Sequence, residues 1–127
     1  MKSKQKCIYN LDAAIESLEK IKCLIKQNRF EQAIAKEANL LYYLGRTLNC
    51  INHLQFINET PRIKPPTFPE KTMDHVSKQQ CIYLVNLGLI NLNKAKSLLI
   101  QDRFEEAENV IISTITGRIL HCLAELL

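Results

Sequence analysis

The chain has 127 residues, of which 46% are hydrophobic and 24% charged, with three glycines and no tryptophan. This composition indicates one globular domain rich in helix-forming residues and excludes a disordered chain. The net charge of +4 comes from interspersed acids and bases, without the dense basic stripe that we would expect for nucleic-acid binding. No secretory hydrophobic segment and no apolar run of membrane-spanning length occur, so we expect a cytoplasmic protein without membrane insertion.

An internal repeat is the most informative feature of the sequence. The residues 7–9 (Cys-Ile-Tyr) recur at 81–83, and the residues 27–31 (Gln-Asn-Arg-Phe-Glu) recur with one change at 101–105, both at an offset of 74. Further along, the offset becomes 72, where Gly-Arg and a cysteine recur. We therefore predict an all-α protein made of two antiparallel helical hairpins, at 5–56 and 71–127, joined by a proline-rich linker at 57–70.

The first hairpin is predicted to consist of two amphipathic helices with a short turn between them. Apolar residues recur every three or four positions in both helices. The stripes are Ile8, Leu11, Ile15, Leu18, Ile21 and Ile25, then Phe30, Ile34, Leu41, Leu44, Leu48 and Ile51. Asn28 is expected to cap the second helix, with Glu31 completing a capping box, and Asp102 and Glu105 repeat this arrangement.

The linker carries four prolines, which oppose helix formation and favour an extended chain. It could join the hairpins by a long crossover or by a simple turn-back, and we expect a four-helix bundle in either case. The segment 110–116 is β-branched almost throughout and would favour a strand on its own. Because its counterpart in the first hairpin is typical of a helix, we predict a helix here, with Phe30 and Phe104 in equivalent buried positions.

The five cysteines are odd in number and lack a CxxC spacing. We interpret them as small buried hydrophobic residues of a protein in a reducing compartment, and not as a disulfide framework. Cys50 and His53, with His121 and Cys122, nominally offer four zinc ligands. Adjacent helical residues diverge by about 100°, so 121 and 122 would not face one metal. We expect no metal and no cofactor.

Arg46 and His53 have a spacing that resembles the arginine–histidine pair of the HEPN-type ribonucleases, in which such residues would hold phosphate and transfer a proton. The pattern is permissive, and the polar residue expected beside the arginine is missing. We therefore expect no enzymatic activity, and an exposed arginine with a histidine near the helix end.

Basic residues gather toward the end of the first helix in each copy and are candidate anion-binding residues. They are Lys20, Lys22, Arg29, Lys94, Lys96 and Arg103. They also suit the negative C-terminal end of a helix, which needs no ligand to explain them. The lysines at 2, 4 and 6 are interpreted as a solvated tail. Glu37 falls on the core face of its helix, so we expect it at the boundary of the core.

Apolar residues beyond those needed for one core suggest a surface that binds a partner protein. Tyr42 and Tyr43 project together from the second helix, and Leu87 and Ile90 lie off the core stripe of the third. We take these four residues as the candidate binding surface for an amphipathic helix of another protein or for a second copy of the chain. The alternative is that the linker or the other hairpin buries them.

The stretch from Ser17 to Leu44 resembles the helical hairpin of flagellar export chaperones of the FliT and FlgN type. Phe30 and Glu31 match the aromatic–acidic pair after the turn, and Glu37 matches a glutamate further along. The resemblance implies a small helical chaperone or adaptor that covers a helix of its partner. Two alternatives stay open: an inhibitor or immunity-type protein that occludes a target machine, and a regulator that binds phosphate or nucleic acid through the repeated lysines.

Overall fold

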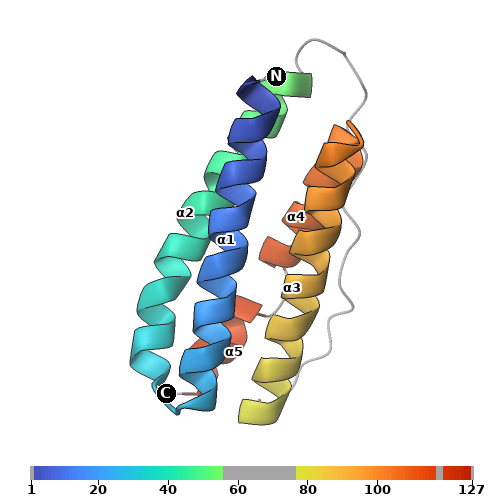
Figure 1. Cartoon of the computed structure of the whole chain (residues 1–127). Coiled ribbons are helices and arrows are strands. Elements are labelled where there is room, and N and C mark those ends of the chain that lie inside the picture. Colours follow the sequence, from blue (N-terminus) through green and yellow to red (C-terminus); the bar gives the residue numbers. More distant parts are fainter. Residues whose placement is uncertain (1, 56–76, 117–118, 127) are drawn as a thin grey trace.

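The computed structural model describes residues 2–55, 77–116 and 119–126, and every regular element in these ranges is a helix. The helices are α1 (Lys2–Lys26), α2 (Phe30–Gln55), α3 (Lys78–Ile100), α4 (Phe104–Thr116) and α5 (Ile119–Glu125). Figure 1 shows α1 and α2 as an antiparallel pair, which we call the first hairpin, and we call α3, α4 and α5 the second hairpin. The predicted linker at 57–70 lies outside the described residues.

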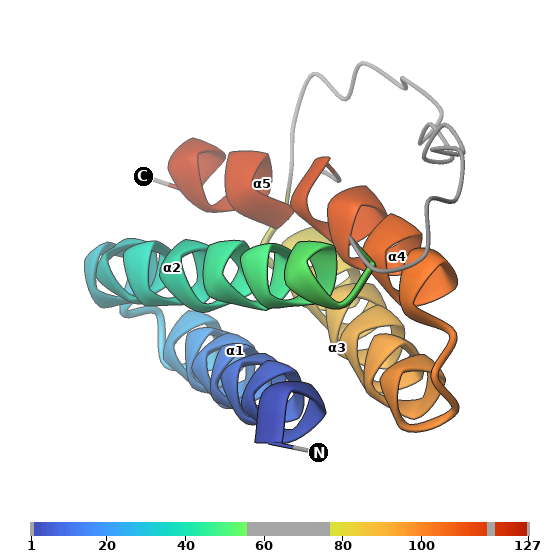
Figure 2. The same cartoon turned by 90° about the horizontal axis from the view of Figure 1, so that it is seen from above.

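The helices pack side by side in a fixed order. α1 contacts α2 and α3, while α4 and α5 contact both α2 and α3. Among the described residues, no contact joins α1 to α4 or α5, or α2 to α3, so these pairs lie diagonally across the molecule. Figure 2, seen from above, shows α4 and α5 on the far side of the molecule from α1. The core therefore receives side chains from both hairpins.

The apolar stripe of α1 is confirmed as a core stripe. Leu11, Leu18, Ile21 and Ile25 are fully buried. On α2 the stripe was placed partly wrong, because Leu41 is 40% exposed whereas its neighbour Leu40 is buried. The buried positions of α2 follow steps of seven, four, three and four residues, which keep one face of a helix against its neighbours. They are Ala33, Leu40, Leu44, Thr47 and Ile51.

The turn between α1 and α2 does not have the predicted capping box. Asn28 has a φ of 59°, and its amide donates to the carbonyl of Ile25 while the next amide, of Arg29, donates to that of Leu24. This is the Schellman arrangement, in which a residue in the left-handed region closes the preceding helix. Asp102 repeats it with a φ of 61°. The prediction was wrong because asparagine and aspartate also tolerate the left-handed region, so they could equally end one helix as begin the next.

A reciprocal pair of lysine contacts joins the two hairpins. Lys4 Nζ donates to the carbonyl of Ile100 at 2.7 Å, and Lys78 Nζ donates to the carbonyl of Lys26 at 3.0 Å. Donors and acceptors in the two contacts are separated by the same offset of 74, so the hairpins are related by an approximate twofold axis. Lys4 also pairs with Asp102 at 2.8 Å. Lys4 therefore belongs to α1, and its prediction as part of a solvated tail was wrong.

The cysteines correct a further prediction. Cys7 is bonded to Cys50 and Cys81 to Cys122, each with a Cα–Cα distance of 5.5 Å, and Cys23 alone is free. In each hairpin the two partners lie at nearly equal distances along the chain from the turn, so folding the hairpin brings them together. The bond closes the end of the hairpin that the turn leaves open. Sequence reasoning overlooked one signal. The repeat preserves both cysteines of each pair, whereas Cys23 is matched by Ser97.

The β-branched segment of the second hairpin is helical, as the repeat predicted. α4 runs to Thr116, and the Thr114 hydroxyl donates to the carbonyl of Val110 at 2.9 Å, which satisfies a buried polar group. After Phe104 the structure describes α4 to Thr116 and α5 from Ile119, and residues 117–118 lie outside the described ranges. The buried Cys122 on α5 is bonded to Cys81 on α3.

Phe30 and Phe104 occupy equivalent environments, but neither is fully buried. Both are half-exposed and pack against the edge of the core, each as the first residue of the helix after the turn. The predicted equivalence is therefore confirmed, and the predicted full burial is wrong.

Candidate functional site

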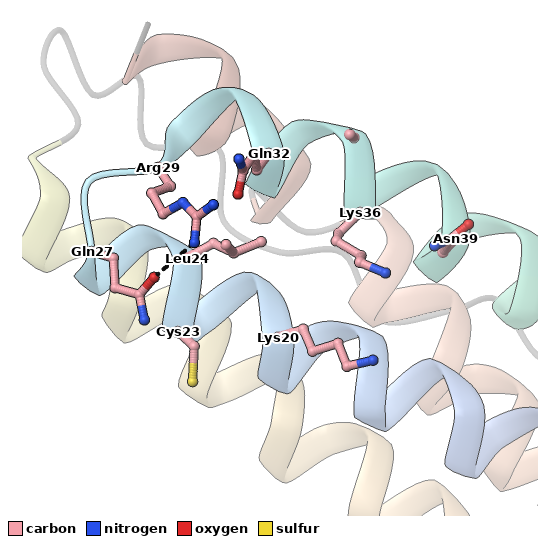
Figure 3. A pocket seen from close by; sticks show the side chains of 9 residues that line it. Lys20, Cys23, Leu24, Gln27, Arg29, Gln32, Lys36 and Asn39 are labelled. Atoms are coloured by element: carbon pink, nitrogen blue, oxygen red, sulfur yellow. Dashed lines mark hydrogen bonds between the residues drawn. The ribbon is translucent and has the colours of Figure 1, made fainter.

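A groove between α1 and α2 has a volume of about 610 Å³. Figure 3 shows its lining side chains, which come from the last two turns of α1, the turn and the first half of α2. They are Lys20, Cys23, Leu24, Gln27, Arg29, Gln32, Ala35, Lys36 and Asn39. We call this the cationic groove, because three of these residues carry positive charge and none is acidic. Its volume falls within the range of small-molecule sites.

The cations of this groove have few partners. The Lys20 ammonium lies 3.6 Å from Glu16 on the exposed face of α1, and Arg29 donates to the Gln27 side chain at 3.5 Å, the outer limit of a hydrogen bond. Among the residues that the structure describes, Lys36 forms no ion pair. Arg29 and Lys36 approach the groove from the α2 side, and Lys20 extends along it from α1 (Figure 3). The predicted residues Lys20 and Arg29 are thus brought together, whereas Lys22 does not line the groove.

The equivalent cations of the second hairpin are arranged differently. Arg103 binds both carboxylate oxygens of Glu106, with its shortest contact at 2.7 Å, and Lys96 pairs with Asp12 at 2.9 Å. Lys94 is exposed on α3. The six predicted anion-binding residues therefore do not form two equal sites, because those of the second hairpin are mostly paired with acids of the protein itself.

A second apolar stripe runs along α2, one residue after the core stripe. It alternates large and small residues in steps of four and three. Its members, which we call the outer seam of α2, are Ile34, Ala38, Leu41, Gly45 and Leu48. Ala38, Leu41 and Gly45 are exposed, whereas Ile34 and Leu48 pack partly against the core. A Cβ atom added at Gly45 would have no neighbour within 4 Å, so the space above this helix is open.

Of the predicted tyrosine pair, Tyr42 lies beside this seam, one helical turn from Ala38 and Gly45, whereas Tyr43 falls on the opposite side of α2. Tyr42 is 56% exposed, and Tyr43 is half-buried against the core. Their rings meet edge to face with centroids 5.3 Å apart, and the Tyr42 hydroxyl accepts a hydrogen bond of 2.9 Å from Arg46. The Arg46 guanidinium also lies 5.6 Å from the Tyr42 ring centroid. These contacts hold Tyr42 in one orientation at the surface.

The predicted residues of α3 are not part of the same surface. Ile90 is 63% exposed and Leu87 is half-buried. Because α2 and α3 lie diagonally with no contact among the described residues, Leu87 and Ile90 are separated from the tyrosine pair. The composite binding surface that the sequence suggested therefore divides into two patches.

Glu37 lies where the core stripe of α2 would continue between Ala33 and Leu40, and it is half-exposed. Burial raises the pKa of its carboxyl above the usual 4.5. Its counterpart Ile111 is fully buried. The predicted boundary position is thus confirmed.

Arg46 and His53 line one further hollow of about 390 Å³, together with Lys6, Asn10, Asn49 and Cys50. Arg46 is engaged by Tyr42 as described above, and no acidic residue lines the hollow. The nominal zinc ligands Cys50 and Cys122 are both consumed by disulfides. In the described ranges, no three potential ligands from histidine, cysteine, aspartate and glutamate gather in a metal-binding arrangement.

Two features of the site were missed in the sequence. Lys36 had no counterpart cation to draw attention to it, since the equivalent residue is Val110, and the outer seam was hidden because Leu41 had been assigned to the core.

Within the part of the chain that the structure describes, no helix combines the length and apolarity needed to cross a membrane. No family model, no curated protein and no solved structure matches this chain.

Proposed function

We propose that the protein is a non-enzymatic interaction module that binds an α-helix of a partner protein along the outer seam of α2. In this proposal the molecule is a four-helix bundle of two hairpins, with α4 and α5 together serving as the fourth helix. The observation that carries the proposal is the seam itself, in which Leu41 is 40% exposed between the exposed small residues Ala38 and Gly45.

The spacing of the seam supports a helical partner. Steps of four and three residues keep the seam straight along a helix, as in a coiled coil, where apolar residues of one helix fit between those of another. Large residues recur at 34, 41 and 48, and small ones at 38 and 45. Small residues let the backbones of two helices approach closely, and the large ones then fit around the partner. An extended peptide or a flat surface would not need this alternation.

Tyr42 supports the same assignment from the side of the seam. Tyrosine is enriched among residues that dominate binding energy at interfaces, and its orientation here is held by Arg46 before any partner arrives. A chaperone or adaptor that covers an exposed helix of its partner would use such a surface, in keeping with the resemblance of this hairpin to export chaperones. The disulfides favour an oxidising compartment over the cytoplasm, because such bonds are rare where thiols are kept reduced.

A photo-crosslinking residue placed at Leu41 tests the proposal. In extracts of the source cell we expect it to trap one defined protein, or a second copy of this chain, through a helical segment identified by mass spectrometry. The same residue at Tyr83, which is 63% exposed on α3, is the matched control. Equal crosslinking from both positions would contradict the proposal.

Gly45 supplies the variants for this experiment. Gly45→Met should abolish the crosslink by preventing close approach, whereas Gly45→Ala should retain it. Since nothing lies within 4 Å of the added Cβ, we expect the alanine variant to be more stable by about 0.5–1 kcal/mol, the usual cost of a helical glycine. If the methionine variant remains folded and crosslinks normally, the seam is not the binding surface.

A further inference from the structure

The residues that give the cationic groove its charge differ from the residues at the equivalent positions of the second hairpin. Arg29 and Arg103 occupy equivalent places, but Arg103 is neutralised by Glu106, whereas the residue facing Arg29 at the same spacing is Gln32. Lys36 is likewise replaced by Val110 in the second hairpin. The lining of the cationic groove therefore carries three positive charges and no negative one, whereas the equivalent positions of the second hairpin include the Arg103–Glu106 ion pair.

We infer that the cationic groove of the first hairpin binds a small ligand that carries several phosphate groups. An arginine guanidinium and two lysine ammoniums spread along one groove match the charge of a triphosphate better than that of a single carboxylate. Gln27, Gln32 and Asn39 add amide groups that can donate hydrogen bonds to phosphate oxygens. Leu24 and Ala35 offer an apolar floor for an attached organic group.

This site is separate from the proposed interaction surface. The groove lies between α1 and α2, so its residues on α2 occupy the flank toward α1. The outer seam lies on a different face of α2. A variant such as Gly45→Met, made to block the seam, should therefore bind the phosphate ligand normally, and each proposal can fail without the other.

Isothermal titration calorimetry of the full, disulfide-bonded chain with inorganic triphosphate tests the inference. We expect one site per chain. Gln32→Glu should weaken binding about tenfold or more, because it gives Arg29 the partner that Arg103 has, and a charge-assisted contact is worth about a factor of ten in affinity. Lys20→Gln should weaken it several-fold. Lys94→Gln removes the same charge from the equivalent exposed position and should change affinity by less than about twofold.

Cys23 provides an independent readout, because it lines the groove and is the free thiol of the chain. Triphosphate at a concentration that half-saturates the wild type should slow its alkylation by an uncharged maleimide, and should slow alkylation of Gln32→Glu much less. Adenosine triphosphate binding more tightly than inorganic triphosphate, with no binding of adenosine, would assign the apolar floor to a nucleoside.

Three results would overturn the inference. One is the absence of saturable triphosphate binding. Another is an equal loss of affinity in Lys20→Gln and Lys94→Gln, which would mean diffuse attraction to a positively charged protein. The third is preferential binding of a single-stranded oligonucleotide that Lys94→Gln weakens as much as Lys20→Gln, which would indicate a broad nucleic-acid surface.

Discussion

The first and second hairpins share the elements that hold their fold, but their surfaces differ. Each has a Schellman turn, a disulfide at the opposite end and a lysine bonded to the other hairpin. In the first hairpin, the helix after the turn carries the outer seam, and the cationic groove has no acidic residue in its lining. In the second, the equivalent arginine is neutralised by Glu106. Elements that hold the fold were retained in both copies, whereas the two surfaces that we propose as binding sites both lie on the first.

The disulfides allow the strongest test of this comparison. Removing either bond with a pair of cysteine-to-alanine changes should lower the free energy of unfolding by about 4 kcal/mol in the chain-entropy account, because each closes a loop of similar length. The sequence separations are 43 and 41 residues. Urea unfolding of Cys7→Ala/Cys50→Ala and Cys81→Ala/Cys122→Ala measures both losses under identical conditions.

The two losses should differ in where the structure opens. α5 has seven residues, too few for a stable helix on its own. Amide hydrogen exchange in α5 should therefore accelerate when Cys81–Cys122 is removed but not when Cys7–Cys50 is removed. The starting protein should expose one reactive thiol when unfolded without reductant. Finding five would show that the bonds do not form and would restore the interpretation of buried thiols.

Glu37 and Ile111 provide a test of intermediate size. Because burial raises the pKa of the Glu37 carboxyl in the folded state, unfolding releases a proton, and stability should fall as the pH rises from about 4.5 through the folded-state pKa. Above that pKa the full penalty is present. Glu37→Ile, which copies the second hairpin, should stabilise the protein at neutral pH by about 0.5–2 kcal/mol.

Glu37→Gln is the matched control, since it keeps the shape of the side chain and removes its titration. The stability difference between wild type and this variant should grow with pH over the same interval and then level off. A difference that does not change between pH 4 and pH 8 would place the carboxyl in water.

The smallest expected effect concerns the surface between α1 and α3. Lys96 pairs with Asp12, whereas the twofold-related Lys22 is matched with Asn86. Asp12→Asn should cost about 0.2–1 kcal/mol, and Asn86→Asp should gain a similar amount by creating the missing pair. Both effects should shrink in 1 M salt. Destabilisation by Asn86→Asp in urea unfolding would mean that the approximate symmetry does not extend to this surface.

The helices could be predicted from the sequence because periodic apolar residues and the repeat gave the same answer. The segment 110–116 shows the value of that agreement, since local propensity alone would have made it a strand. The bounds of the core were less predictable. Leu40 and Leu41 are adjacent and equally apolar, and only the packing of neighbouring helices decides which of them is buried.

The site was predictable only in part, because its determinants are relations between residues distant in the sequence. Lys20 and Arg29 were identified by their repetition, yet Lys36 joins them through the fold of the hairpin. Predicting the two disulfides required knowing that the beginning and the end of each hairpin lie side by side in the fold. Sequence spacing alone could not show that Arg103 pairs with Glu106, or that Lys96 pairs with Asp12, because other acidic residues lie nearby.

The reciprocal contacts of Lys4 and Lys78 have a consequence for how such a chain could have arisen. Each hairpin offers the other the same donor and the same acceptor, which is the property of an isologous dimer interface. A protein containing one hairpin could have formed this assembly from two separate molecules before its gene was duplicated in tandem. Joining the two halves then replaced a concentration-dependent encounter with an intramolecular one, for which short flexible connections give effective concentrations in the millimolar range. Once the halves were joined, each could change without changing the other, which a symmetric dimer of identical chains does not allow.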